Sequence, residues 1–154
     1  MTSRYEQFYL VISGIYRAIN RIERMEMVKH GFKGSYAHYL NVIAKHEGAT
    51  ATDLEEICNI DKAAVSRSIA EMEEKGLIKR EGAFEDNKRH YRSKIFLTEK
   101  GKEIANIVHD KASAAVLAVG STMDDEERKI VYDVLNRVFD ELKAVGRKGI
   151  PDIE

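Results

Sequence analysis

The fold is decided by residues 52–76, which read TDLEEICNIDKAAVSRSIAEMEEKG. Thr52 and Glu55 have the spacing of a capping box, in which each side chain hydrogen-bonds to the backbone of the other residue. This pattern predicts a short helix that begins at Thr52 and turns three side chains inward, those of Leu54, Ile57 and Cys58. Asn59 follows where a tight turn is needed, and asparagine tolerates the left-handed backbone conformation better than most residues.

A second helix is predicted directly after this turn. Asp61 is a good N-cap, and apolar residues recur at i, i+4 and i+7, namely Val65, Ile69 and Met72. Gly76 supplies the C-terminal stop. Two short helices joined by a tight turn form a helix-turn-helix.

The remaining face of the second helix suits a DNA groove. Its first two turns offer small, hydroxylated or cationic side chains, those of Lys62, Ala63, Ala64, Ser66, Arg67 and Ser68. Small residues let a helix enter a major groove about 12 Å wide, and arginine can bind guanine through two hydrogen bonds. We therefore predict that these six residues contact DNA, together with Thr52 in the first helix.

A two-stranded hairpin with a basic tip is predicted next. Residues 77–81 and 92–98 read as strands, with Ile95 and Leu97 on one face. Residues 87–94 contain four cations and no anion, and these cations are Lys88, Arg89, Arg92 and Lys94. Such side chains fit DNA phosphates or a narrow minor groove. A basic hairpin is more often only a solvated surface, so its place after the helix-turn-helix is what favours DNA.

Apolar periodicity predicts helices on both sides of this region. A helix over residues 3–29 is roughly 40 Å long at 1.5 Å per residue, and its apolar stripe consists of Phe8, Ile12, Ile15, Ile19 and Ile22. A helix over residues 35–46 follows, and another begins near Thr98. The last helix begins at Thr122 or Asp124 and repeats Val131, Leu135, Val138, Leu142 and Val145. The predicted fold class is mainly α with a small two-stranded β wing.

Three stretches of the sequence resemble the MarR family of winged helix-turn-helix transcriptional regulators. Residues 60–67, IDKAAVSR, resemble the opening of the family's recognition helix, VDKSTVTR. Residues 74–80, EKGLIKR, resemble the end of that helix and the first wing strand, and residues 97–101, LTEKG, resemble the second strand and the next helix. The family's Asp-x-Arg wing motif is displaced upstream here, which leaves open which wing arginine reaches DNA.

The resemblance implies a single domain over residues 1–154 that forms a homodimer. Residues 32–101 would form the winged DNA-binding lobe, and residues 3–29 and 102–146 would form the dimerisation helices. Two recognition helices would then face successive major grooves, about 34 Å apart, on a pseudo-palindromic operator.

The resemblance also implies a repressor that a small aromatic or phenolic effector releases from DNA. Tyrosines are concentrated in the first two predicted helices, and their apolar rings with polar tips suit an effector pocket. Tyr16, Tyr36 and Tyr39 are the candidate effector contacts, although packing at helical spacing is an equally simple role for each.

Composition limits the other function classes. Lys and Arg number 25 and Asp and Glu number 26, so the basic strip matters more than the net charge of −1. The chain has no apolar run of about 18 residues and no signal-peptide region, which predicts a cytoplasmic protein without membrane contact. No catalytic grouping or phosphate loop is present, so neither an enzyme nor a cofactor is predicted. The alternative function is a winged-helix module that binds another protein without reading DNA sequence.

Cys58 and the histidines are the remaining reactive side chains. Cys58 lies in an apolar stripe, which favours a core residue over a redox sensor. The candidate histidines His30, His38, His46 and His109 show no metal-binding spacing, so no metal site is predicted.

Overall fold

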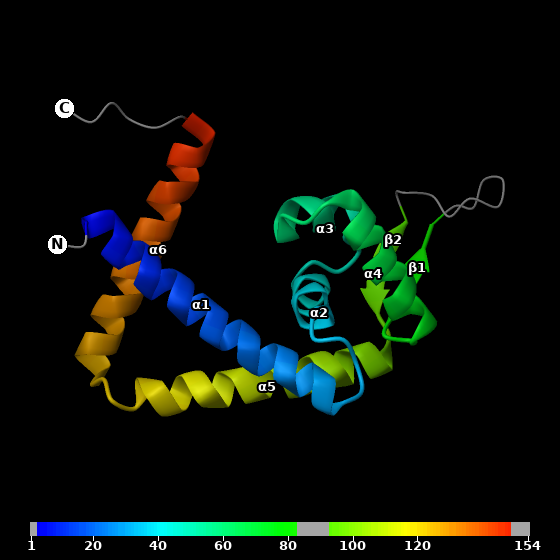
Figure 1. Cartoon of the computed structure of the whole chain (residues 1–154), viewed down its shortest axis with the longest axis horizontal. Helices are drawn as coiled ribbons and strands as arrows, with labels where there is room; N and C mark the ends of the chain where they lie inside the picture. The colour runs from blue at the N-terminus through cyan, green and yellow to red at the C-terminus, as the bar shows by residue number, and fades with distance from the viewer. Residues whose placement is uncertain (1–2, 83–92, 149–154) are drawn as a thin grey trace. The chain divides into compact units, whose positions relative to one another are not determined.

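The structure is a computed structural model that describes residues 3–82 and 93–148. The described elements are α1 (Arg4–Lys29), α2 (Tyr36–Lys45), α3 (Ala51–Cys58), α4 (Lys62–Glu74), β1 (Ile78–Glu81), β2 (Lys94–Leu97), α5 (Glu99–Gly120) and α6 (Asp125–Lys148) (Figure 1). The chain divides into two compact units, residues 1–113 and residues 114–154. The predicted fold class, mainly helical with a two-stranded antiparallel wing, is confirmed.

The helix-turn-helix forms as predicted from α3 to α4. Asn59 adopts the left-handed conformation with φ 51° and ψ 47°. Asp61 caps α4 by accepting a hydrogen bond from the Ala64 backbone at 3.0 Å. Val65, Ile69 and Met72 are buried in the same core as Leu54 and the apolar face of α2. Burial of these three side chains fixes which face of α4 points outward.

The predicted start of α3 is wrong. The capping box joins Thr50 and Asp53, so α3 begins at Ala51 and Thr52 is an exposed residue of its first turn. The cause lies outside the helix, because the Ala49 carbonyl accepts a hydrogen bond from the Ile95 amide at 2.9 Å. This bridge to β2 holds the chain extended up to Thr50. Ile57 also differs from the prediction, since its side chain is 46% exposed.

Two threonine substitutions distinguish the two caps. Thr50→Ala removes the side chain that accepts from the Asp53 amide, and we expect it to lower the free energy of unfolding by about 1 kcal/mol. Thr52→Ala is the matched control, and it is expected to be neutral or slightly stabilising because alanine favours helix. Urea unfolding of both variants measures the difference. Equal losses in the two variants would contradict the observed cap.

The wing connects the end of α4 to the start of α5. β1 pairs with β2 in antiparallel register, with Ile78 opposite Leu97 and Glu81 opposite Lys94. Thr98 then donates a hydrogen bond from its hydroxyl to the Gly76 carbonyl at 2.6 Å and accepts one from the Gly101 amide at 3.0 Å. One side chain therefore both caps α5 and fixes it to the chain that leaves α4.

Long apolar stripes remain exposed on the single chain. In α1, the side chains of Phe8, Ile12 and Ile15 are 36–53% exposed. In the second unit, no described side chain of α6 is buried, and its exposed apolar residues include Val131, Leu135, Phe139 and Leu142. None of the described helices combines the length and the hydropathy needed to cross a membrane.

Candidate nucleic-acid interface and adjoining pocket

The N-terminal half of α4 presents most of the side chains predicted to contact DNA. Lys62, Ala63, Ser66 and Arg67 are exposed, whereas Ala64 and Ser68 are half-buried. Arg67 makes no hydrogen bond or ion pair with any residue in the described ranges 3–82 and 93–148. No acidic residue occurs between Lys62 and Ala70. This half of α4 can therefore approach a polyanion without repulsion from the helix itself.

Two of the three acidic side chains in the C-terminal half of α4, those of Glu71 and Glu73, are held by cations of the same unit. Glu71 accepts hydrogen bonds from Lys33 Nζ at 2.7 and 2.8 Å and from the Tyr36 hydroxyl at 2.6 Å. Glu73 accepts two from the Arg80 guanidinium, at 2.6 and 3.1 Å. These bonds position the helix and neutralise acids that would otherwise repel DNA.

The Glu71 contacts predict an acid-dependent loss of stability. The Lys33 ammonium, and next to it the Tyr36 hydroxyl, lower the pKa of Glu71 below its usual value. A carboxyl whose pKa is lowered in the folded state stabilises the fold above its unfolded pKa, about 4.3 for glutamate. That contribution is lost as the pH falls through the folded-state pKa.

We therefore expect Glu71→Gln to be less stable than the wild type at pH 7, with the difference vanishing as the pH falls below about 4. Thermal unfolding between pH 7 and pH 3 measures it. Glu74→Gln is the control on the same helix, since no hydrogen bond joins Glu74 to another described residue, and it should change stability little at pH 7. A Glu71→Gln deficit that persists unchanged at pH 3 would refute this reading.

The other predicted DNA contacts are only partly placed. Thr52 is exposed on α3, and Lys94 is the exposed first residue of β2. Lys88, Arg89 and Arg92 lie outside the described residues. The DNA contacts of the wing therefore stay predictions from sequence, and the structure adds only that Lys94 is exposed.

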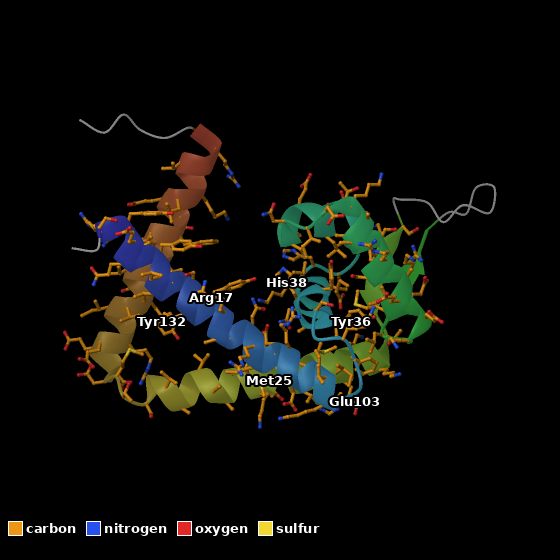
Figure 2. The ribbon with its side chains drawn as sticks, viewed as in Figure 1. Arg17, Met25, Tyr36, His38, Glu103 and Tyr132 are labelled. Carbon is orange, nitrogen blue, oxygen red and sulfur yellow. The ribbon has the colours of Figure 1, made fainter. Side chains whose placement is uncertain are left out.

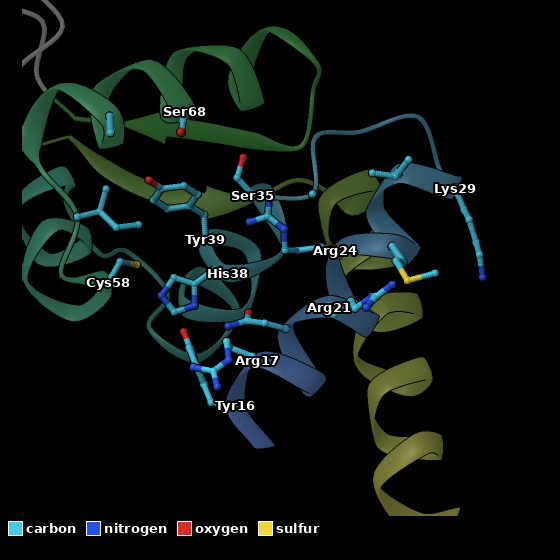
Figure 3. A pocket seen from close by; sticks show the side chains of 16 residues that line it. Tyr16, Arg17, Arg21, Arg24, Lys29, Ser35, His38, Tyr39, Cys58 and Ser68 are labelled. Carbon is cyan, nitrogen blue, oxygen red and sulfur yellow. The ribbon is translucent and has the colours of Figure 1, made fainter. Parts of the chain in front are cut away.

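A pocket of about 1120 Å³ adjoins α4 within the first unit (Figure 3). Ala64 and Ser68 of α4 form part of its wall, and Tyr16, Tyr39, Cys58 and Ile60 are also among the lining residues. The two half-buried residues of α4 thus face the pocket rather than open solvent. Any molecule bound in the pocket would touch the helix that carries the predicted DNA contacts.

The candidate tyrosines separate into two groups. Tyr16 and Tyr39 line the pocket, but Tyr36 is not part of its wall. Tyr36 is completely buried, and its hydroxyl binds Glu71 instead. Its expected role as an effector contact is therefore not supported, because the side chain belongs to the core between α2 and α4.

Burial also sets the charge states of two lining residues. It raises the pKa of the Tyr39 phenol, while a hydrogen bond with Ser68 acts in the opposite direction. Burial likewise raises the pKa of the Cys58 thiol, which keeps the sulfur in its less nucleophilic form. Within the described parts of the chain, no three His, Cys, Asp or Glu side chains lie close enough to hold a metal ion.

Sequence reasoning missed the basic side chains of the pocket. Arg17, Arg21 and Arg24 of α1 line it together with His38 of α2, and Arg17 and His38 are labelled in Figure 2. The signal was available, because spacings of four and three residues place side chains on one helical face. Apolar periodicity in α1 indicates only its apolar stripe and not this basic one.

Comparison with known proteins agrees with this geometry. The family model described as MarR family matches residues 30–90. An HTH-type transcriptional regulator of Bacillus subtilis (strain 168), YdgJ, is 26% identical over 115 residues, which cover 75% of this chain and 68% of that protein.

Solved structures share the fold over nearly the whole chain. Staphylococcus aureus MarR in complex with salicylate and kanamycin superposes with a TM-score of 0.76 at 22% identity, over 91% of this chain and 93% of that one. A MarR family regulator from Listeria monocytogenes complexed with 26mer DNA gives 0.70 at 23% identity, over 93% and 95%. The family model over residues 30–90 and the winged helix-turn-helix fold shared with these structures make this chain similar to regulators of the MarR family.

Proposed function

We propose that the protein is a homodimeric, sequence-specific DNA-binding transcriptional regulator, and specifically a repressor that a small effector releases from its operator. The observation that carries the proposal is the exposed, acid-free N-terminal half of α4 with an unpaired Arg67 among the described residues. The DNA complex of the Listeria regulator supports the same use of this fold. In this chain, residues 32–101 serve as the DNA-binding lobe, and residues 3–29 and 102–146 serve as the dimerisation helices.

DNA binding is tested by fluorescence anisotropy on duplexes from the region upstream of the gene. Because binding releases counterions from phosphates, affinity should fall steeply and linearly on a log–log plot against salt concentration. Lys94→Ala should reduce that slope by about one unit, as expected for one phosphate contact. A protein partner captured with salt-insensitive affinity, and no affinity for any duplex, would favour the interaction-module alternative.

Self-association follows from the exposed apolar stripes. Monomeric proteins rarely leave apolar patches of this extent in water, and a second copy of the chain would cover them. Light scattering is expected to give twice the mass of one chain. The double substitution Leu135→Asp and Leu142→Asp should give the mass of one chain, whereas the control Arg137→Gln should leave the mass unchanged. A wild-type protein with the mass of one chain would contradict the proposed dimer.

The pocket beside α4 is the proposed effector site. The Staphylococcus aureus regulator was solved with salicylate, and an aromatic or phenolic compound of that size suits the Tyr16 and Tyr39 walls here. Because Ala64 and Ser68 belong to both the pocket wall and α4, a ligand that fits only one orientation of α4 would shift the population away from the DNA-binding state.

A further inference from the structure

The pocket beside α4 is positively charged. Its lining includes four basic side chains, those of Arg17, Arg21, Arg24 and Lys29, and no aspartate or glutamate. A chain with slightly more acids than bases has no general reason to concentrate cations in one hollow. The positive charge is therefore a local property of the pocket, since the whole chain has a net charge of −1.

Three of these cations form an unneutralised row along α1. Arg17, Arg21 and Arg24 follow one another at i, i+4 and i+7, so they share one helical face over about 10 Å. None of the three makes a hydrogen bond or ion pair with any part of the chain that the structure describes. Like charges at this spacing destabilise a helix, and a bound anion would offset that cost.

The neighbouring carboxylates of α1 do not form ion pairs with these arginines. Glu23 accepts a hydrogen bond from the Asn41 amide at 2.9 Å. Glu26 binds Lys29 at 3.1 Å and lies 3.5 Å from His30. Glu23 and Glu26 therefore lie within about one turn of the arginines but bind other side chains, so the three arginines have no carboxylate partner among the described residues.

Facing walls of the pocket are apolar or neutral. Tyr39 is 3% exposed, and Ile60, Ala64 and Ser68 lie with it along the lining (Figure 3). An occupant would therefore place its acidic groups against α1 and its uncharged body against α2 and α4.

We propose that the pocket takes a small ligand with two or more negative charges, carried by carboxylate or phosphate groups on a compact apolar body. Arginine binds either group through two parallel hydrogen bonds. A single carboxylate engages one arginine, whereas a second carboxylate about one turn further along α1, or the additional charged oxygen of a phosphate, engages the next. The inference rests on the proposed effector pocket and specifies the charge of its ligand.

The test is calorimetric titration of the full-length protein with four probes: benzoate, isophthalate, phenyl phosphate and inorganic phosphate. Isophthalate and phenyl phosphate are expected to bind roughly tenfold or more tightly than benzoate, because they engage a second arginine. Comparing isophthalate with phenyl phosphate shows which acidic group the pocket prefers, and inorganic phosphate shows whether the apolar body contributes.

Three substitutions locate the effect. Arg17→Gln, Arg21→Gln and Arg24→Gln should each weaken a doubly charged probe toward the affinity of benzoate. Each should also leave the ligand-free protein as stable as the wild type or slightly more stable, because one repulsive charge is gone. Arg4→Gln is the matched control, since it removes the same charge from α1 outside the pocket.

Equal binding of benzoate and the doubly charged probes, or binding that the arginine substitutions leave unchanged, would overturn the inference, as would a lack of binding by all four probes. Loss of DNA affinity in the three variants without any probe binding would assign the row to the DNA backbone, which also overturns it. Release of DNA is measured separately by anisotropy. Tight probe binding without release would leave the charge preference standing and contradict only the proposed effector response.

Discussion

Replacing Gly101 with alanine is expected to lower the free energy of unfolding by about 3 kcal/mol. Gly101 is buried in the first turn of α5, where a Cβ atom would overlap the backbone carbonyl of Leu77. That carbonyl accepts a hydrogen bond from the Thr98 amide at 3.1 Å, so it cannot withdraw without breaking the link between the wing and α5. The alanine must therefore force two backbone segments apart.

Gly146→Ala provides the control for this substitution. At Gly146, a Cβ atom would come within 4 Å of no described part of the chain beyond its own stretch of helix, and alanine gains up to about 1 kcal/mol over glycine inside a helix. Chemical denaturation should thus show opposite signs for the two glycines. A Gly101→Ala protein as stable as the wild type would show that α5 does not begin against Leu77.

Arg67→Ala is expected to reduce affinity for the preferred DNA sequence by about 10- to 100-fold, which corresponds to about 1–3 kcal/mol for one lost base contact. Affinity for unrelated duplexes should change much less, because the loss falls on sequence reading. Arg67 is well placed for this role, since it is exposed on α4 and free of partners among the described residues. Anisotropy titrations on specific and unrelated duplexes measure both effects.

Two further variants separate charge from geometry. Arg67→Lys keeps the charge but cannot form the paired hydrogen bonds of a guanidinium, so it should lose discrimination as the alanine variant does. Lys75→Ala removes a cation at the C-terminal end of α4 and should leave the discrimination between DNA sequences intact. If Arg67→Ala weakened all duplexes equally, the residue would be a phosphate contact and not a base contact.

Local signals were sufficient to predict most of the helix boundaries. Asp61 and Gly76 delimit α4 as predicted, and Asn59 adopts the left-handed turn because its position between two capped helices admits few alternatives. The start of α3 was mispredicted because Thr50 and Thr52 both stand three residues before an acid. Only the long-range bridge between Ala49 and Ile95 selects between them, and such a bridge leaves no local signature.

The residues of the candidate site were likewise only partly predictable from the sequence. Exposure of Arg67 follows from the burial of Val65, Ile69 and Met72 on the opposite face, so the sequence predicts it. The role of Tyr36 does not follow, because its partner Glu71 lies 35 positions away in the chain. The spacing of Arg17, Arg21 and Arg24 predicts that they share one face of α1. That this face lines a pocket could not be predicted, because the other walls come from α2 and α4.

The central claim is that the two α4 helices of a homodimer recognise DNA sequence together. It is tested most directly by selecting bound duplexes from a random pool. The account predicts enrichment of a pseudo-palindrome whose half-sites lie about 10 base pairs apart, centre to centre, and loss of that enrichment in Arg67→Ala. Recovery of unrelated sequences by the wild type, or of a lone half-site, would contradict it.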